Sequence, residues 1–119
     1  MLLELFLILL MGVGGLVAHE LGHVFAYRVL RPDGRWSVEL RGPALAVEIE
    51  TEVVGLRRCV VATAGPTLGA IFVLVVSQAA AGGSVSHLFV SLHLAMLVPI
   101  FADGRQFVLG VREMVPLTD

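Results

Sequence analysis

The sequence predicts a mainly α-helical membrane protein with three transmembrane helices and a short β-hairpin between helices 1 and 2. Of its 119 residues, 57% are hydrophobic and 15% are charged, whereas soluble domains are about 45–50% apolar and about 25% charged. Eleven of the 18 charged residues lie between Arg28 and Arg58, and the stretch from Cys59 to Ala102 contains none. About 20 apolar residues cross a bilayer as a helix. This pattern and the single cysteine exclude a nucleic-acid-binding module and a disulfide-stapled secreted domain.

The first predicted element is one long helix over residues 1–30. Its apolar interior holds a single acidic residue, Glu20. The helix is expected to end before Pro32, because the residue before a proline avoids the helical region. A cleaved signal peptide explains this segment less well, because its start carries Glu4 and no positive charge.

Residues 35–53 predict a two-stranded hairpin that lies at the membrane surface. Apolar and polar residues alternate from Trp36 to Arg41 and again from Leu45 to Glu52. A period of two is typical of strands with one buried face. Gly42-Pro43 is the expected turn between the two strands.

Two more helices and an interfacial tail complete the predicted single domain, which covers residues 1–119. The second helix is expected over residues 54–81, with an interruption at Gly65-Pro66. The third helix is expected over residues 85–101, and the tail covers residues 103–119 and begins with a short amphipathic helix.

The distribution of arginine predicts the orientation of the chain. The first loop carries six of the eight arginines, the second loop carries none and the tail carries two. Because cationic residues concentrate on the cytoplasmic side, we expect a multi-pass protein of the cell membrane with its N-terminus outside. The hairpin and the C-terminus would then be cytoplasmic. The lipid bilayer is an expected partner and nucleic acid is not.

An HExxH motif, His19-Glu20-Leu21-Gly22-His23, lies on the first helix. The i, i+4 spacing stacks both imidazoles on one helix face, where two nitrogens can reach one metal ion. Zn²⁺ accepts imidazole and carboxylate ligands, and Glu20 is placed to act as a general base toward water. Two histidines satisfied inside a helix bundle are the structural alternative. Ionisable residues inside a membrane segment are costly and mark function, which favours the metal site.

A zinc site needs a third protein ligand, and the candidates are His87, His93 and Asp103. Asp103 follows Pro99 at the cytoplasmic end of the third helix, at the depth of the HExxH motif. His93 precedes Asp103 by ten residues, about 15 Å along a helix, so we expect it not to share that metal. His87 is expected at the opposite membrane face. Packing or interface anchoring is the expected role of both of these histidines.

Gly65 and Pro66 are candidate substrate-binding residues. Proline removes one N–H from the second helix and frees the carbonyl of Ala62. A free backbone acceptor at membrane depth suits a polar cavity, but a simple packing kink explains the dipeptide equally well.

Together these motifs resemble the site-2 protease family of intramembrane zinc metalloproteases. The match comprises AHELGH at 18–23, AGPTLG at 64–69 and LVPIFADG at 97–104. The three stretches follow the order of the family and extend over the whole chain. The resemblance implies a minimal three-helix core in which His19, His23 and Asp103 are the zinc ligands and Glu20 is the catalytic base.

The chain departs from this family at Gly69 and Met96, where asparagine is usual, and the interval from Pro99 to Asp103 is one residue short. These departures concern hydrogen bonds to the transition state more than metal binding. The expected function is that of a zinc-dependent endopeptidase whose substrate is a transmembrane or membrane-adjacent protein. The alternative is a degenerate, non-proteolytic member that binds metal or a partner and acts as a regulator. A metal-ion carrier is disfavoured because the chain lacks a second polar helix face.

Overall fold

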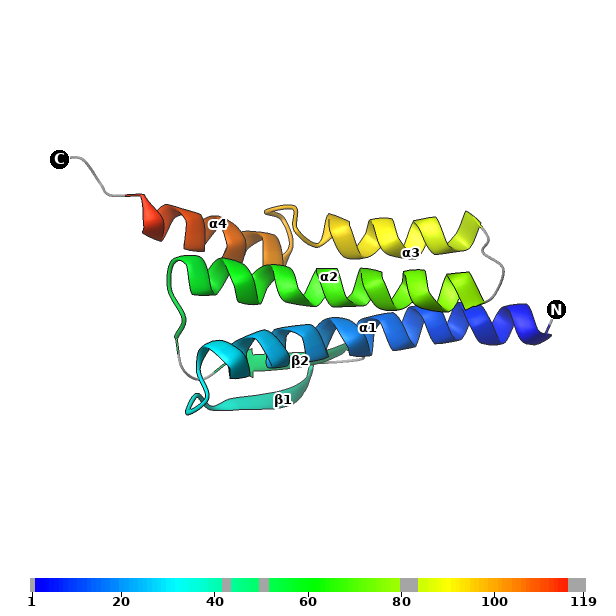
Figure 1. Cartoon of the computed structure of the whole chain (residues 1–119), viewed down its shortest axis with the longest axis horizontal. Coiled ribbons are helices and arrows are strands. Elements are labelled where there is room, and N and C mark those ends of the chain that lie inside the picture. Colours follow the sequence, from blue (N-terminus) through cyan, green and yellow to red (C-terminus); the bar gives the residue numbers. More distant parts are fainter. Residues whose placement is uncertain (1, 42–43, 50–51, 80–83, 116–119) are drawn as a thin grey trace.

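Four helices and two strands lie within the residues that the computed structural model describes, which are 2–41, 44–49, 52–79 and 84–115. Their order is α1 (Leu2–Leu30), β1 (Trp36–Arg41), β2 (Ala44–Ile49), α2 (Leu56–Ala79), α3 (Ser84–Ala95) and α4 (Ala102–Met114). The molecule is elongated, with extents of 60 × 28 × 26 Å. Figure 1 shows α1 along one side of α2, and α3 followed by α4 along the other side. The central helix α2 therefore contacts the three other helices.

The two long helices match the first two predicted membrane segments. α1 is 29 residues long, about 44 Å at 1.5 Å per residue, and it ends before Pro32 as predicted. Within the described chain, the stretches that are long and apolar enough to cross a membrane are Leu2–Leu30 and Leu56–Gln78. α2 continues through Pro66 without a break, so the predicted interruption at Gly65-Pro66 is wrong. A proline removes one helical hydrogen bond, and the packing of α2 between its neighbours holds the turns on either side.

The prediction of a third transmembrane helix over residues 85–101 is wrong. α3 has 12 residues, about 18 Å of helix, whereas the hydrocarbon core is about 30 Å thick. Residues 96–101 form successive turns that contain Pro99, which cannot donate the next helical hydrogen bond. The N–H of Gly104 then returns to the carbonyl of Met96 at 3.1 Å. The chain that runs back along α2 is therefore divided into two shorter helices, α3 and α4.

The tail predicted over residues 103–119 is helical from Ala102 to Met114, and residues 116–119 lie outside the described part. α4 packs against the start of α2, where the buried Cys59 thiol lies 3.5 Å from the carbonyl oxygen of Phe107. Arg58 fixes the same junction through ion pairs with Glu52 at 2.8 Å and Glu113 at 3.1 Å.

The predicted hairpin within residues 35–53 is confirmed. β1 and β2 pair antiparallel in the register Trp36↔Ile49 to Arg41↔Ala44, and the expected turn at Gly42-Pro43 lies outside the described residues. The hairpin lies beside the C-terminal half of α1 (Figure 1), and β2 contacts that helix. Tyr27, which is fully buried, anchors the connection because its hydroxyl donates to the carbonyl of Arg35 at 3.1 Å.

Candidate metal centre

Three of the predicted site residues meet in one cluster at the middle of the molecule. The Nε2 atoms of His19 and His23 are 3.1 Å apart. His19 Nε2 lies 3.1 Å from one oxygen of Asp103, and His23 Nε2 lies 3.3 Å from the other. Both imidazoles are buried and the carboxylate is half-buried. This group could hold a metal ion.

Glycines at the crossing of α1 and α2 make room for the two histidines. A side chain at Gly22 would overlap the carbonyl of Ala64, and one at Gly65 would overlap the His23 ring. The close approach also lets His23 Nδ1 donate a hydrogen bond to the carbonyl of Val61 at 2.8 Å. A ring that donates from Nδ1 keeps its Nε2 lone pair for the cluster, which is the usual arrangement behind a metal-bound histidine.

Asp103 reaches the cluster because turns at residues 96–101 separate α3 from α4. It lies in the first turn of α4, where the helix dipole favours a negative charge. Burial by itself raises the pKa of the Asp103 carboxyl, but the imidazoles of His19 and His23 outweigh that effect and lower the pKa to about 2. The residue is therefore ionised near neutral pH, as a cation ligand must be.

Glu20, the predicted general base, is half-buried on α1 next to the first histidine of the cluster. Its Oε2 atom accepts a hydrogen bond from the backbone N–H of Val47 on β2 at 3.1 Å. The hairpin is thereby tied to α1 at the depth of the cluster.

Gly65 and Pro66, the predicted substrate-binding residues, are both buried in α2. The structure gives Gly65 a packing role, because its missing side chain leaves the space that the His23 ring occupies. Contact of either residue with a substrate stays a prediction.

His93 lies next to the cluster, contrary to the depth predicted for it. Its ring centroid is 5.8 Å from that of His19, and the residue is 3% exposed. The separation of about 15 Å from Asp103 assumed one continuous helix, but α3 ends at Ala95 and the chain turns back. No spacing rule could have found this contact. His87 is exposed in the first half of α3.

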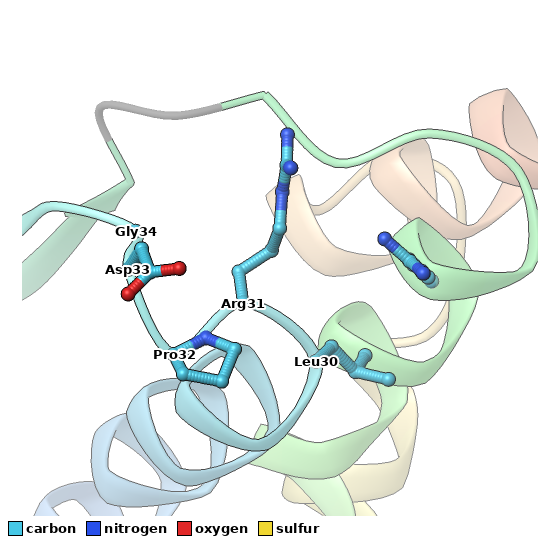
Figure 2. A pocket seen from close by; sticks show the side chains of 6 residues that line it. Leu30, Arg31, Pro32, Asp33 and Gly34 are labelled. Carbon is cyan, nitrogen blue, oxygen red and sulfur yellow. The ribbon is translucent and has the colours of Figure 1, made fainter.

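A pocket of about 300 Å³ lies apart from the cluster, at the C-terminal end of α1 (Figure 2). The pocket is lined by Leu30, Arg31, Pro32, Asp33, Gly34 and Arg57. Leu30 is roughly 16 Å along α1 from His19. None of the predicted site residues lines this pocket.

Comparisons with protein-family models, with curated proteins and with solved structures find no match to this chain. The class of this protein is therefore described from its fold and its candidate site alone. The protein is mainly helical, has a two-stranded sheet and carries a buried His-His-Asp group that could hold a metal ion. Two of the described helices could cross a membrane.

Proposed function

We propose that this protein is a zinc-dependent intramembrane endopeptidase, similar to the site-2 proteases, that cleaves a transmembrane or membrane-adjacent protein. The observation that carries the proposal is the convergence of His19, His23 and Asp103 midway along a long apolar helix. Polar groups of this kind are expensive at membrane depth and are kept there for function.

The close grouping and the chemical types of the ligand groups are compatible with zinc. Tetrahedral zinc with bonds of about 2.0–2.1 Å holds its ligand atoms roughly 3.3 Å apart. The two Nε2 atoms of His19 and His23 are 3.1 Å apart, and each lies near a different oxygen of Asp103, Oδ2 at 3.1 Å for His19 and Oδ1 at 3.3 Å for His23. Taken with one ligand atom from each residue, the three atoms lie within 4.8 Å of one another. Imidazole with carboxylate also suits zinc better than it suits calcium or magnesium, which take oxygen ligands. Three protein ligands leave a fourth position open, which is typical of catalytic zinc sites.

The surface of α1 supports a place in the bilayer. In its most apolar stretch only 22% of the residues are buried within the protein. Large side chains that are more than half exposed include Leu5, Phe6, Val13 and Leu16. Contiguous apolar surface on this scale is rare on soluble monomers. Lipid contact accounts for it, and the arginine distribution favours a cytoplasmic hairpin.

In the proposed chemistry, a bound zinc ion would act as the Lewis acid and Glu20 as the general base. A bound zinc ion supplies a Lewis acid that polarises a peptide carbonyl and acidifies water. Glu20 removes a proton from the attacking water and delivers it to the leaving amine. For this step the hydrogen bond between the Val47 N–H and the Glu20 carboxylate has to break. An extended substrate that pairs with the edge of β2 would take over that N–H, so substrate binding and release of Glu20 would coincide.

The second candidate is a non-proteolytic protein that binds metal and regulates a partner. The hydrogen bond between Glu20 and Val47 favours it, because the proposed base is engaged by the hairpin. Both candidates bind zinc through the same residues. Only the first predicts cleavage.

The test uses the full chain purified in lipid nanodiscs. We expect about one zinc per chain and cleavage of at least one member of a panel of single-span membrane substrates, with loss of cleavage on chelation. His23→Ala should lose both zinc and cleavage, whereas His87→Ala, at an exposed histidine, should lose neither. Zinc binding without cleavage of any substrate supports the second candidate. Absence of stoichiometric zinc overturns both.

A further inference from the structure

His93 is a buried histidine next to the metal centre to which the proposed chemistry assigns no role. Its Nδ1 atom lies 2.8 Å from the carbonyl oxygen of Phe89, one turn earlier in α3. A carbonyl can only accept, so Nδ1 carries the proton and the lone pair of the neutral ring is on Nε2. That Nε2 atom is buried and has no hydrogen-bond partner among the described residues.

Two glycines on different helices shape the space that holds the His93 ring. A side-chain carbon at Gly69 of α2 would overlap the ring, and one at Gly15 of α1 would come within 3.0 Å of its Cε1 atom. The ring therefore lies between α1 and α2, against their backbones. Larger residues at these positions would exclude it, so its orientation is fixed by the packing of three helices.

His19 has the complementary unsatisfied atom. Its Nε2 faces His23 and Asp103, so a metal ion there takes the lone pair of Nε2 and leaves the proton on Nδ1. This Nδ1 atom is buried and has no partner in the described part of the chain. His23 differs, because its Nδ1 donates to the carbonyl of Val61. Of the two metal-facing histidines, His19 is the one whose outer nitrogen has no partner.

An unsatisfied donor and an unsatisfied acceptor thus lie on neighbouring rings, whose centroids are 5.8 Å apart and whose planes are tilted by 49°. Leaving both buried without partners is costly. A single water molecule between two such groups satisfies both.

We propose that His93 is a positioning residue for the metal centre. Its Nε2 accepts the Nδ1–H of His19 through one water molecule, which fixes the tautomer and the orientation of that ligand. This inference rests on the proposed metal centre but not on proteolysis. Outer partners of this kind change metal affinity by about 10–100-fold when they are removed.

The experiment compares His93→Leu, which fills the space of the ring with an apolar side chain that has no acceptor, with His93→Gln, which provides an acceptor. His87→Leu is the matched control, because it removes an exposed histidine from the same helix. We expect His93→Leu to weaken zinc binding by about 10–100-fold in chelator competition. His93→Gln should recover most of the affinity, and His87→Leu should match the unaltered protein. The Co²⁺ absorption spectrum should stay the same in all variants, because the ligand set is unchanged.

Nitrogen NMR of the histidines provides a readout that a purely structural role would not move. In the zinc-loaded protein, the Nδ1–H resonance of His19 should shift in His93→Leu and return toward its original position in His93→Gln. An unmoved resonance overturns the inference, as does equal zinc affinity in the leucine and glutamine variants. A changed Co²⁺ spectrum would make His93 a direct ligand and overturn it too. Failure of proteolysis alone leaves these readouts intact, so the two proposals fail separately.

Discussion

The carboxylate of Glu20 on α1 accepts the backbone N–H of Val47 on β2, at 3.1 Å. Val47 is in register with Val38 of β1, yet its N–H points to Glu20, so it faces away from the partner strand. In an antiparallel pair, alternate residues direct their N–H groups outward in this way. The outer edge of β2 therefore faces α1 next to the candidate metal centre, and under the proposed function an extended peptide would add there as a further strand.

Glu20→Gln is the first prediction. The amide oxygen can still accept the Val47 N–H, so the hairpin should stay docked, and zinc content should stay near one per chain. An amide cannot take a proton from water, so cleavage should fall by at least about 100-fold. Zinc analysis and a substrate-cleavage assay on the same preparation measure both quantities.

Glu4→Gln is the control for that variant. It makes the same chemical change on the same helix, roughly 24 Å away by helical rise, and should leave cleavage unchanged. If Glu20→Gln retained full cleavage, Glu20 would not be the base.

Gly65→Ala is the second prediction. The added methyl group would overlap the His23 ring, so either the ligand or the α1–α2 crossing must move. We expect a loss of about 1–3 kcal/mol in the free energy of unfolding together with weaker zinc binding. Thermal unfolding with and without zinc separates the two effects. Gly12→Ala is the matched control, since its methyl group would make an ordinary contact of 3.4 Å with Phe89.

Much of this fold follows from local patterns in the sequence. The alternation on either side of Gly42-Pro43 predicted the paired strands, and Pro32 predicted the end of the first helix. The i, i+4 spacing of His19 and His23 predicted the face that they share. Each of these signals acts within a few residues, where backbone geometry decides the outcome.

Two predictions for the segment after α2 were wrong: the single helix over residues 85–101 and the depth of His93. The same apolar composition is compatible with one long helix or with two short ones. The contacts of Gly104 with residues 96–98, which come only with the folded chain, decide between the two. The position of His93 depends on that break. It also depends on Gly15 and Gly69, which are far apart in the sequence.

The third prediction concerns membrane orientation. With Cys59→Ser as background, Ser37→Cys should be labelled from the cytoplasmic side and Ser84→Cys from the outside. The hairpin and the start of α3 lie toward opposite ends of the molecule (Figure 1), and the arginines concentrate around the hairpin. An impermeant thiol reagent applied to intact cells and to inverted vesicles measures this. Labelling of both positions from the same side would show that α2 does not cross the membrane.

The fourth prediction is that Asp103→Asn weakens zinc binding more than any substitution of His93 does. Asn keeps the shape of the side chain but removes the charge that lies 3.1 Å from His19 Nε2 and 3.3 Å from His23 Nε2. Removing a direct ligand should cost more than the roughly 10–100-fold expected for an outer partner. Asp33→Asn, the same change in the loop after α1, is the control and should bind zinc normally.

Chelator competition on Asp103→Asn, His93→Leu and the unaltered protein gives the ranking directly. The Co²⁺ spectrum adds a second criterion, because loss of a ligand changes the coordination geometry whereas loss of an outer partner does not. The carboxylate is delivered by the first turn of α4. Arg58 of α2 contacts that helix at Gln106, one turn after Asp103, at 3.1 Å, and at Glu113 near its other end, also at 3.1 Å. Arg58→Ala should therefore weaken zinc binding in the same direction as Asp103→Asn, but by less, since α4 keeps its apolar contacts. Full zinc affinity in Asp103→Asn would remove Asp103 from the ligand set and leave a site of two histidines.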